Sequence, residues 1–372
     1  MSLFAPAACP RLVVKVGSAL LVDAGGAIRR DWLGGLVADI AERHAAGQQV
    51  IVVSSGAIAL GARRLGLPKG GRASLEDAQA AAATGQIALS GAWAELLADR
   101  GLTAAQLLVT LDDLEQRRRY LNVAATLGRL LMLGVVPVVN ENDSVATEEI
   151  RFGDNDRLAA RVGQAANADG VVLLSDIDGL YDRNPTHDPD ARFIERVERI
   201  DAAVEAMADT RSASGMGSGG MVSKVQAARI ATAAGAHLAI ASGRVERPLS
   251  RFADTGRGTV FVARPAQPAR KAWLQGRLIA GGTIHIDAGA AAALQDGRSL
   301  LPAGATSVEG RFARGDLVMI LDEAGQPVAR GLSEYDAEEA VRIVGRRSDE
   351  LEAILGHAPR TALVHRNHMV VA

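Results

Sequence analysis

The chain has few of the features that would place it outside the cell or in a membrane. It contains one cysteine in 372 residues, Cys9, so no disulfide can form within the chain. The first residues show neither a basic segment nor an apolar run followed by a small-residue cleavage site. No apolar run approaches the roughly 18 to 20 residues that a membrane span requires. We therefore expect a cytoplasmic protein without a membrane partner.

A surplus of one charge sign is also missing. Forty-one Lys and Arg residues nearly balance 43 Asp and Glu residues, which gives a formal net charge of −2. Nothing in this total indicates nucleic acid or an anionic membrane as the main partner, although local basic patches are compatible with it. Apolar residues make up 48% of the chain, enough to bury a full core. A chain of this length is typical of a large domain followed by a small one.

Short apolar runs alternate with longer helical patterns between residues 11 and 262. This alternation is typical of βαβ units, and we expect a mainly parallel sheet. Most strand candidates are continuous apolar runs, as in strands covered on both faces: residues 12–16, 50–53, 107–110, 135–139, 171–174 and 237–241. Helices are predicted over residues 31–46 with Asp31 as N-cap, from Ser74 towards Asp99, and over residues 118–133 before Gly134.

The sequence pattern changes near residue 265. The segment Arg264-Pro265-Ala266-Gln267-Pro268 is typical of a linker. Short strand-like runs with glycine-rich turns follow at residues 273–278, 283–286, 307–309, 317–321 and 328–332, with a short helix at 287–294. We therefore expect a first domain over residues 1–264, a linker over 265–269 and a small β-rich barrel over 270–372.

Chemistry is expected where the strands of the first domain end, because open α/β sheets bind ligands there. Val14-Lys15-Val16-Gly17-Ser18 combines a lysine with a glycine at the end of the first strand, which suits a phosphate. A lysine that merely reaches solvent from the strand end explains the same pattern. Ser54-Ser55-Gly56-Ala57 offers hydroxyls and amides that can hold a carboxylate, but a plain helix cap explains Ser55 equally well.

Acids and amides are concentrated in two neighbouring segments, Asn140-Glu141-Asn142-Asp143 and Phe152-Gly153-Asp154-Asn155-Asp156. A solvated loop is one explanation of this composition. The functional alternative is that Asp143 takes an ammonium group while Asn140 and Asn155 bind polar substrate groups. Asp154 and Asp156 lie two residues apart, so in an extended segment they share a face, where they can orient lysines or bind Mg²⁺.

A glycine-rich segment forms the fourth junction, together with Ser175-Asp176-Ile177-Asp178-Gly179-Leu180-Tyr181. The run from Gly215 to Gly220 leads directly into the helical pattern of residues 224–234. Such a loop offers amide donors and the positive end of a helix to phosphates, and Lys224 adds a full charge. The alternative, a flexible linker, fits poorly because the loop is short and leads into a helix. We therefore predict an anion-binding loop.

Together these segments resemble the amino acid kinase family, and the likeness spans the whole chain. Within that family they are similar to the members that phosphorylate free L-glutamate. The resemblance implies a three-layer α/β/α sandwich with a central, mostly parallel sheet. The tail from about Arg270 resembles the PUA domain, a small β-rich barrel named for RNA-modifying enzymes. Ser175, Ser218 and Ser223 stand where the family often has threonine, which keeps the hydroxyl and should alter packing but not the reaction.

The resemblance implies transfer of the γ-phosphoryl group of ATP to the side-chain carboxylate of L-glutamate. We assign catalysis to Lys15, Lys224 and Asp156. Glutamate binding is assigned to Ser55, Gly56, Ala57, Asn140, Asp143, Asp154 and Asn155. ATP binding is assigned to Lys15, Gly17, Ser175, Asp176, Tyr181, Ser218, Gly219, Gly220, Met221, Val222, Ser223 and Lys224. Mg²⁺ is expected mainly on the ATP phosphates, so no protein ligand is assigned to it.

The resemblance also implies partners and leaves rival functions to be tested. The implied partners are a glutamyl phosphate reductase that takes the product into proline synthesis, proline as feedback inhibitor, and further copies of the chain. The nearest rival is another family member, acting on N-acetylglutamate, aspartate or a nucleoside monophosphate. A different rival is an RNA-binding protein that acts through its tail, although the few aromatic residues there form no evident stacking platform.

Overall fold

The computed structural model describes residues 3–23, 25–145, 154–185, 187–208, 220–263, 280–360 and 362–371, with backbone alone for residues 117, 154 and 367. The chain divides into two compact units, Met1–Ala266 and Gln267–Ala372. The predicted linker over 265–269 and the predicted strand over 273–278 lie outside the described residues. No helix in the described ranges combines the length and the hydropathy needed to cross a membrane.

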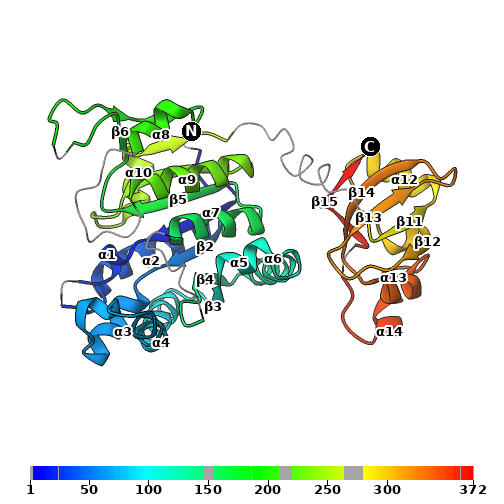
Figure 1. Ribbon diagram of the computed structural model, residues 1–372, viewed down its shortest axis with the longest axis horizontal. Coiled ribbons are helices and arrows are strands. Elements are labelled where there is room, and N and C mark those ends of the chain that lie inside the picture. Colours follow the sequence, from blue (N-terminus) through cyan, green and yellow to red (C-terminus); the bar gives the residue numbers. More distant parts are fainter. Residues whose placement is uncertain are drawn as a thin grey trace. The chain divides into compact units, whose positions relative to one another are not determined.

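The first unit is built on an eight-stranded sheet with the order β3-β4-β2-β1-β5-β9-β10-β8 (Figure 1). Its strands are β1 Arg11–Val16, β2 Gln49–Ser54, β3 Ala104–Val109, β4 Val136–Glu141, β5 Gly170–Ser175, β8 Arg196–Val197, β9 His237–Ser242 and β10 Thr259–Phe261. Neighbours from β3 to β9 are all parallel, and β9 pairs with β10 in the antiparallel sense. The expected mostly parallel sheet is confirmed, and each predicted strand of this unit is present.

Helices cover both faces of this sheet and make the expected three layers (Figure 1). Alternate β1 residues point to opposite faces, so Leu12 and Val14 pack with α2, α4 and α10, while Val13 packs with α6, α7 and α9. The helices are α1 Ser18–Leu21, α2 Arg30–Ala45, α3 Ala57–Leu65, α4 Leu75–Ala98, α5 Leu111–Glu115, α6 Arg117–Met132, α7 Asp154–Ala166, α8 Ala202–Ala208, α9 Met221–Ala233 and α10 Pro248–Thr255. A 3-10 turn, Pro68–Gly71, and a hairpin of β6 Leu180–Tyr181 and β7 Phe193–Ile194 complete the unit.

Helix boundaries follow the predicted caps in two of three cases. Ser74 caps α4, since its side chain accepts a hydrogen bond from the Asp77 amide. α6 ends just before Gly134, which has the left-handed φ of 71°. The prediction for α2 was wrong: the N-cap is Arg29, because the Leu33 amide already bonds to the Arg29 carbonyl. Asp31 lies in the first turn, where its charge favours the helix end.

The second unit contains a five-stranded sheet with the order β12-β11-β13-β14-β15. Its strands are β11 Gly282–Ile286, β12 Ala305–Gly310, β13 Leu317–Leu321, β14 Pro327–Ser333 and β15 Val364–Val371, and its helices are α12 Ala288–Gln295, α13 Ala337–Ile343 and α14 Leu351–Leu355, with a 3-10 turn at Pro302–Gly304. Ile284, Val318 and Ile320 are fully buried in its core. The expected small β-rich domain is confirmed, although β15, α13 and α14 were not predicted.

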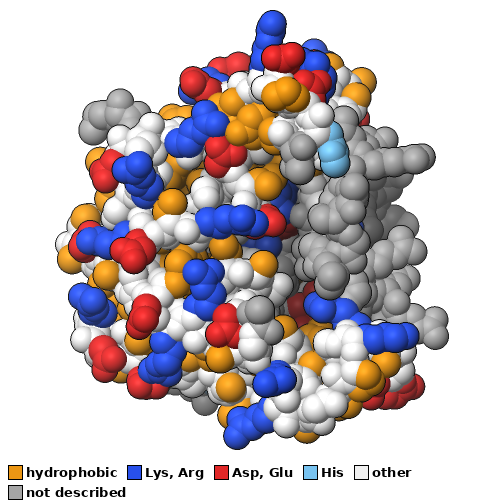
Figure 2. All heavy atoms as spheres, turned by 90° about the vertical axis from the view of Figure 1, so that its left-hand side faces the viewer, with side chains coloured by type: hydrophobic (Ala, Val, Ile, Leu, Met, Phe, Trp, Pro, Cys, Tyr) orange, Lys and Arg blue, Asp and Glu red, His pale blue; other side chains and the backbone are white. Residues whose placement is uncertain are grey.

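The surface carries both charge signs. On the face shown in Figure 2, Lys and Arg side chains are interspersed with Asp and Glu side chains. This distribution agrees with the nearly balanced total charge of the sequence.

Candidate functional site

Three charged side chains meet in the interior of the first unit. The Lys15 Nζ atom is 2.6 Å from Asp156 Oδ1, and the Lys224 Nζ atom is 3.1 Å from Asp156 Oδ2. The side chain of Asp156 is completely buried, and those of Lys15 and Lys224 are only 8% and 7% exposed. One carboxylate therefore holds two ammonium groups in a site almost closed to water.

The fold explains how residues so far apart in sequence come together. Lys15 is the penultimate residue of β1 and points to the same face of the sheet as Val13, the face covered by α7 and α9. Asp156 lies in the first turn of α7, and Lys224 lies in the first turn of α9. Because both helices begin near the carboxyl ends of the central strands, their first turns converge on the lysine from β1.

The charges of this cluster do not cancel. Burial alone would raise the pKa of Asp156, but the ammonium groups of Lys15 and Lys224 outweigh burial and hold that pKa below its usual range. Burial lowers the pKa of Lys224, with Asp156 acting against that shift and Lys15 adding to it. Two ammonium groups share one carboxylate, so the three side chains together carry one excess positive charge. Burying such a charge costs several kcal/mol unless an anion accompanies it, so the cluster suits a phosphate.

A chain of polar side chains lies beside the charged cluster. Asn155, next to Asp156 in α7, donates from Nδ2 to Ser55 Oγ at 2.6 Å and to Asn140 Oδ1 at 3.2 Å. Asn140 donates from its own Nδ2 to Gln86 Oε1 at 2.8 Å. Ser54 takes no part, because its hydroxyl accepts a hydrogen bond from the buried Trp93 indole. The structure thus brings Ser55, Asn140 and Asn155 together and adds Gln86, which the sequence pattern did not indicate.

The turn after Ser55 has a backbone that favours glycine. Gly56 caps α3 with a φ of 112°, and a Cβ there would lie 3.2 Å from Val22 Cγ2. Ala57, the first residue of α3, is buried. Both residues place main-chain groups next to Ser55, as the prediction requires. Asp154 begins α7, and its side chain lies outside the described part.

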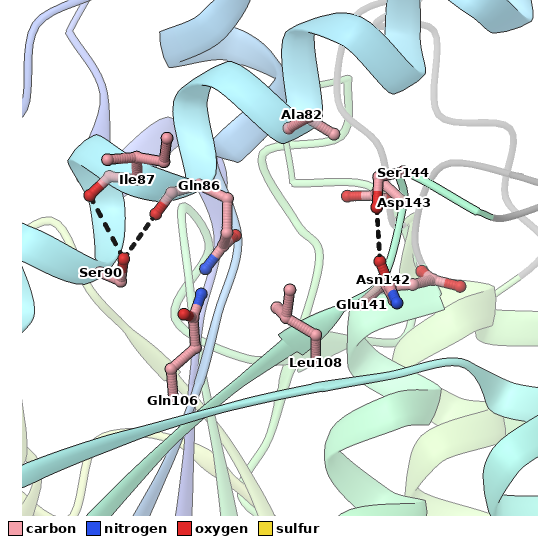
Figure 3. Close-up of a pocket in the computed structure, with 11 residues that line it drawn as sticks. Ala82, Gln86, Ile87, Ser90, Gln106, Leu108, Glu141, Asn142, Asp143 and Ser144 are labelled. Atoms are coloured by element: carbon pink, nitrogen blue, oxygen red, sulfur yellow. Dashed lines mark hydrogen bonds between the residues drawn. The ribbon is translucent and has the colours of Figure 1, made fainter.

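Asp143 is a partly buried carboxylate beside a cavity. Burial raises its pKa to about 6, with Arg72 acting in the opposite direction. Asp143 lines a cavity of about 350 Å³ between α4, β3 and the segment after β4. In Figure 3, Gln86 and Gln106 lie on one side of this cavity, and Asp143 lies on the other with Ser144, whose hydroxyl bonds to Asn142. The cavity joins the region of Asp143 to Gln86, and hence to the polar chain.

The predicted nucleotide residues lie along the carboxyl ends of β1 and β5. Gly17 follows β1, and a Cβ there would lie 3.7 Å from Lys15 Nζ. Ser175 ends β5 and its hydroxyl donates to Asp176 Oδ1 at 3.1 Å. Arg244 follows β9, and its Nη2 atom is 3.8 Å from Asp176 Oδ2. Asp176 also acts to raise the pKa of Lys224, so this end of β5 lies near the charged cluster.

Tyr181 belongs to a second polar group on the β6-β7 hairpin. Its hydroxyl donates to Asp178 Oδ1 at 3.0 Å and accepts from Arg257 Nη2 at 3.1 Å. Arg257 also donates to Asp178 Oδ2 at 2.9 Å and stacks over the Phe193 ring at 3.7 Å. These contacts of Arg257 hold the turn between Ser175 and Tyr181, and no local pattern predicted this role.

The glycine-rich segment is described only at its end. Ser218 and Gly219 lie outside the described residues. Gly220 caps α9, and Met221, Val222, Ser223 and Lys224 form its first turn. The first amides of this helix are at its positive end, which suits an anion.

The described side chains of the site do not form a metal cage. In the ranges that the structure describes, no three His, Cys, Asp or Glu side chains are grouped to hold a metal ion. Both Asp156 oxygens already face ammonium groups. The described donors thus fit an anionic phosphate better than a metal held by the protein alone.

Comparisons with known proteins relate the first unit to one enzyme family and the second unit to one domain family. The profile of the amino acid kinase family matches residues 10–242, and the profile of the PUA domain matches residues 282–355. A glutamate 5-kinase of Sphingopyxis alaskensis is 73% identical over 371 residues, covering 100% of both chains. A glutamate 5-kinase of Zymomonas mobilis subsp. mobilis is 64% identical, covering 100% of this chain and 93% of its own. A solved carbamate kinase from Giardia lamblia bound to AMP-PNP is 17% identical, with a TM-score of 0.50 over 69% of this chain and 99% of its own.

Proposed function

Because the chain belongs to the amino acid kinase family, we propose that it transfers the γ-phosphoryl group of ATP to the γ-carboxylate of free L-glutamate. This is the reaction of a glutamate 5-kinase, and the full-length likeness to enzymes of that name supports it. The structural observation that carries the proposal is the buried pair of ammonium groups on Asp156, a receptor for a migrating phosphoryl group.

The substrate brings its own nucleophile. A glutamate side chain has a reference pKa of about 4.3, so its carboxylate is ionised at pH 7 and needs no general base. The obstacle is repulsion between this anion and the phosphates of ATP. In a loose transition state the charge spreads over the equatorial oxygens of the moving group, and cations must meet it there.

Lys15 and Lys224 are the cations in this proposal. Asp156 keeps both ammonium groups in place before the substrates arrive, so little reorganisation is required during the reaction. The amides at the start of α9 and around Gly17 add donors for the phosphates. Mg²⁺ bound to the phosphates of ATP would add positive charge there, and we assign it no protein ligand.

The polar chain and Asp143 select the amino acid. We assign the end of glutamate that carries the α-ammonium and α-carboxylate to Asp143 and Asn155 as a pair, with Ser55 and the amides of Gly56 and Ala57 on the carboxylates. A site built to pair these groups rejects an analogue without the amine, because the carboxylate of Asp143 then lacks the ammonium group that it is placed to bind. Asn140 is 2% exposed and bonds to Asn155 and Gln86, which supports an action through Asn155.

The product suggests the wider setting. We propose that the labile acyl phosphate passes to a glutamyl phosphate reductase on the way to proline, that proline inhibits the enzyme, and that the chain assembles with copies of itself in the cytoplasm. The domain boundaries at 264/265 and 269/270 stay predictions. RNA binding by the PUA domain also stays a prediction.

A hydroxamate assay tests the function directly. Purified protein with ATP and Mg²⁺ should form γ-glutamyl hydroxamate from free glutamate and hydroxylamine. N-acetylglutamate and aspartate serve as competing substrates in parallel reactions. Turnover of N-acetylglutamate or aspartate at a higher kcat/KM than glutamate would assign the chain to another activity of its family.

A further inference from the structure

Gln86 stands at one end of the polar chain that runs through Asn140 and Asn155 to Ser55. The four residues come from α4, β4, α7 and the turn after β2. Gln86 is 54 positions from Asn140, and Asn155 is 100 positions from Ser55. Nothing in the proposed reaction requires a glutamine at position 86, so its place in this chain calls for a physical explanation.

The chain has a direction, because each amide has one donor end and one acceptor end. Gln86 turns its oxygen to Asn140, so Asn140 must present its nitrogen to Gln86 and its oxygen to Asn155. Asn155 then turns its nitrogen to both Asn140 and Ser55. The orientation of one amide thus determines the orientation of the next.

One atom of Asn155 is left without a partner by this arrangement of described residues. Asn155 Oδ1 is buried and has no hydrogen-bond partner in the part of the chain that the structure describes. A buried acceptor without a donor is costly, and nearly all buried polar atoms in folded proteins have a hydrogen-bond partner. The leftover atom accepts hydrogen bonds, so its missing partner is a donor.

We infer that Gln86 is a positioning residue that holds Asn155 with its oxygen toward the substrate, where it accepts a hydrogen bond from the α-ammonium of glutamate. The inference rests on the proposed function, which supplies the amino acid. If every amide of the chain were reversed, Asn155 would offer its nitrogen and would bind the α-carboxylate instead. Gln86 therefore decides which end of the amino acid Asn155 recognises.

The backbone around Gln86 is fixed tightly enough for this role. A Cβ on the neighbouring Gly85 would lie only 1.9 Å from the Ala57 carbonyl oxygen, and one on Gly61 would lie only 1.7 Å from the Ala81 carbonyl oxygen. The backbones of α3 and α4 are thus in direct contact. This contact holds Gln86 at a set distance from the turn of Ser55.

Two substitutions of Gln86 test the direction of the chain. Gln86→Met keeps the length of the side chain but removes its acceptor, and should raise the KM for glutamate roughly tenfold, while the KM for ATP changes less than about twofold. Gln86→Glu has only acceptor atoms when ionised, so it holds Asn140 in the observed orientation. It should return the KM for glutamate to within about threefold of the unaltered protein.

Gln106 supplies matched controls, because it lines the same cavity on β3 and is exposed (Figure 3). Gln106→Met should leave both KM values unchanged. Gln106→Glu measures how far one added negative charge in the cavity changes the KM for glutamate. The change in KM for Gln86→Glu is divided by this factor to correct for charge. KM does not depend on the fraction of active protein, so partial misfolding of a variant does not imitate the expected result.

The outcomes separate the inference from the proposed function. If the unaltered protein does not phosphorylate glutamate, the proposed function fails, and the direction of the chain is then read from glutamate affinity by calorimetry with the same variants. If it does, a Gln86→Glu enzyme as weak for glutamate as Gln86→Met, after the charge correction, overturns the inference. An unchanged KM in Gln86→Met overturns it too.

Discussion

Asp156 in the first unit and Glu334 in the second are both carboxylates with a basic side chain at each oxygen. Asp156 is fully buried between two lysines that are themselves almost fully buried. Glu334 Oε1 is 3.1 Å from His368 Nδ1, and its Oε2 is 3.9 Å from Arg360, whose side chain is 35% exposed. The Glu334 group ties the end of β14 to β15, and Arg360 also reaches water. The Asp156 group buries more positive than negative charge.

This difference separates a structural ion group from one that needs a ligand. The Glu334 group needs no ligand, because basic side chains meet both of its carboxylate oxygens and Arg360 also reaches water. A buried group with surplus charge costs free energy in the empty protein, and that cost is offset when an anion binds. We therefore expect substitutions at Asp156 to act on the reaction and substitutions at Glu334 to act on folding.

The largest effect is expected from Asp156→Asn. The amide cannot hold two ammonium groups, so Lys15 and Lys224 separate and lose their placement at the phosphoryl group. We expect kcat at saturating substrates to fall roughly 10²- to 10³-fold. Glu334→Gln is the control and should leave kcat within about twofold. Equal losses of kcat in both variants would show that Asp156 and Glu334 do not differ in their effect on the reaction.

A pH profile gives the next largest effect, through Asp143. Its pKa is raised to about 6, so below that pH the carboxyl group binds a proton and loses its attraction for the α-ammonium of glutamate. The kcat/KM for glutamate should fall about tenfold per pH unit below about pH 6. This limb is separate from protonation of the glutamate side chain, with a pKa of about 4.3. Asp143→Asn should lower kcat/KM at pH 8 and abolish the limb, and an identical limb in that variant would refute the assignment.

A smaller effect is expected at Arg257. Arg257→Met removes the hydrogen bonds that hold Asp178 and Tyr181 while keeping an apolar stem against Phe193. The turn after β5 then loosens, and we expect the KM for ATP to rise about three- to tenfold with the KM for glutamate unchanged. Arg251→Met, an exposed arginine on α10, is the matched control. A rise in the KM for glutamate alone would show that Arg257 supports glutamate binding and not ATP binding.

The smallest effect on activity, with a clear effect on stability, is expected at Glu334. Burial would raise its pKa, but His368, Arg314 and Arg360 outweigh burial and keep that pKa below its usual range. A lowered folded-state pKa stabilises the protein above the unfolded value of about 4.3, and the gain disappears as the pH falls through the folded value. Urea unfolding of Glu334→Gln should show a loss of about 1 to 3 kcal/mol at pH 7, shrinking toward pH 3. A constant loss across this range would mean that packing, rather than charge, is responsible.

Much of the first unit could be predicted because its signals are local. Continuous apolar runs marked the central strands, and Lys15 and Lys224 lie within four positions of glycines at strand and helix ends, where phosphates are usually bound. Asp156 was recognisable within its acidic segment. That it meets both lysines is a property of the fold, and its catalytic role stays a prediction.

Other residues left no local signal. Gln86 is one of several polar residues in an alanine-rich helix, and its partner Asn140 is 54 positions away. Arg257 meets Asp178 across 79 positions. β15 was missed because polar residues from His365 to His368 interrupt the apolar alternation that marks a strand. Such contacts depend on how distant elements pack, which composition and spacing do not determine.

The binding of a transition-state analogue tests the role of the two ammonium groups most directly. ADP, aluminium fluoride and glutamate together imitate the migrating phosphoryl group, whereas ATP alone reports the ground state. If Lys15 and Lys224 act on the moving group, Lys224→Met should weaken the analogue complex about 100-fold or more and ATP binding less than about fivefold. Equal weakening of both complexes would show that Lys224 only binds the nucleotide, and would contradict the account.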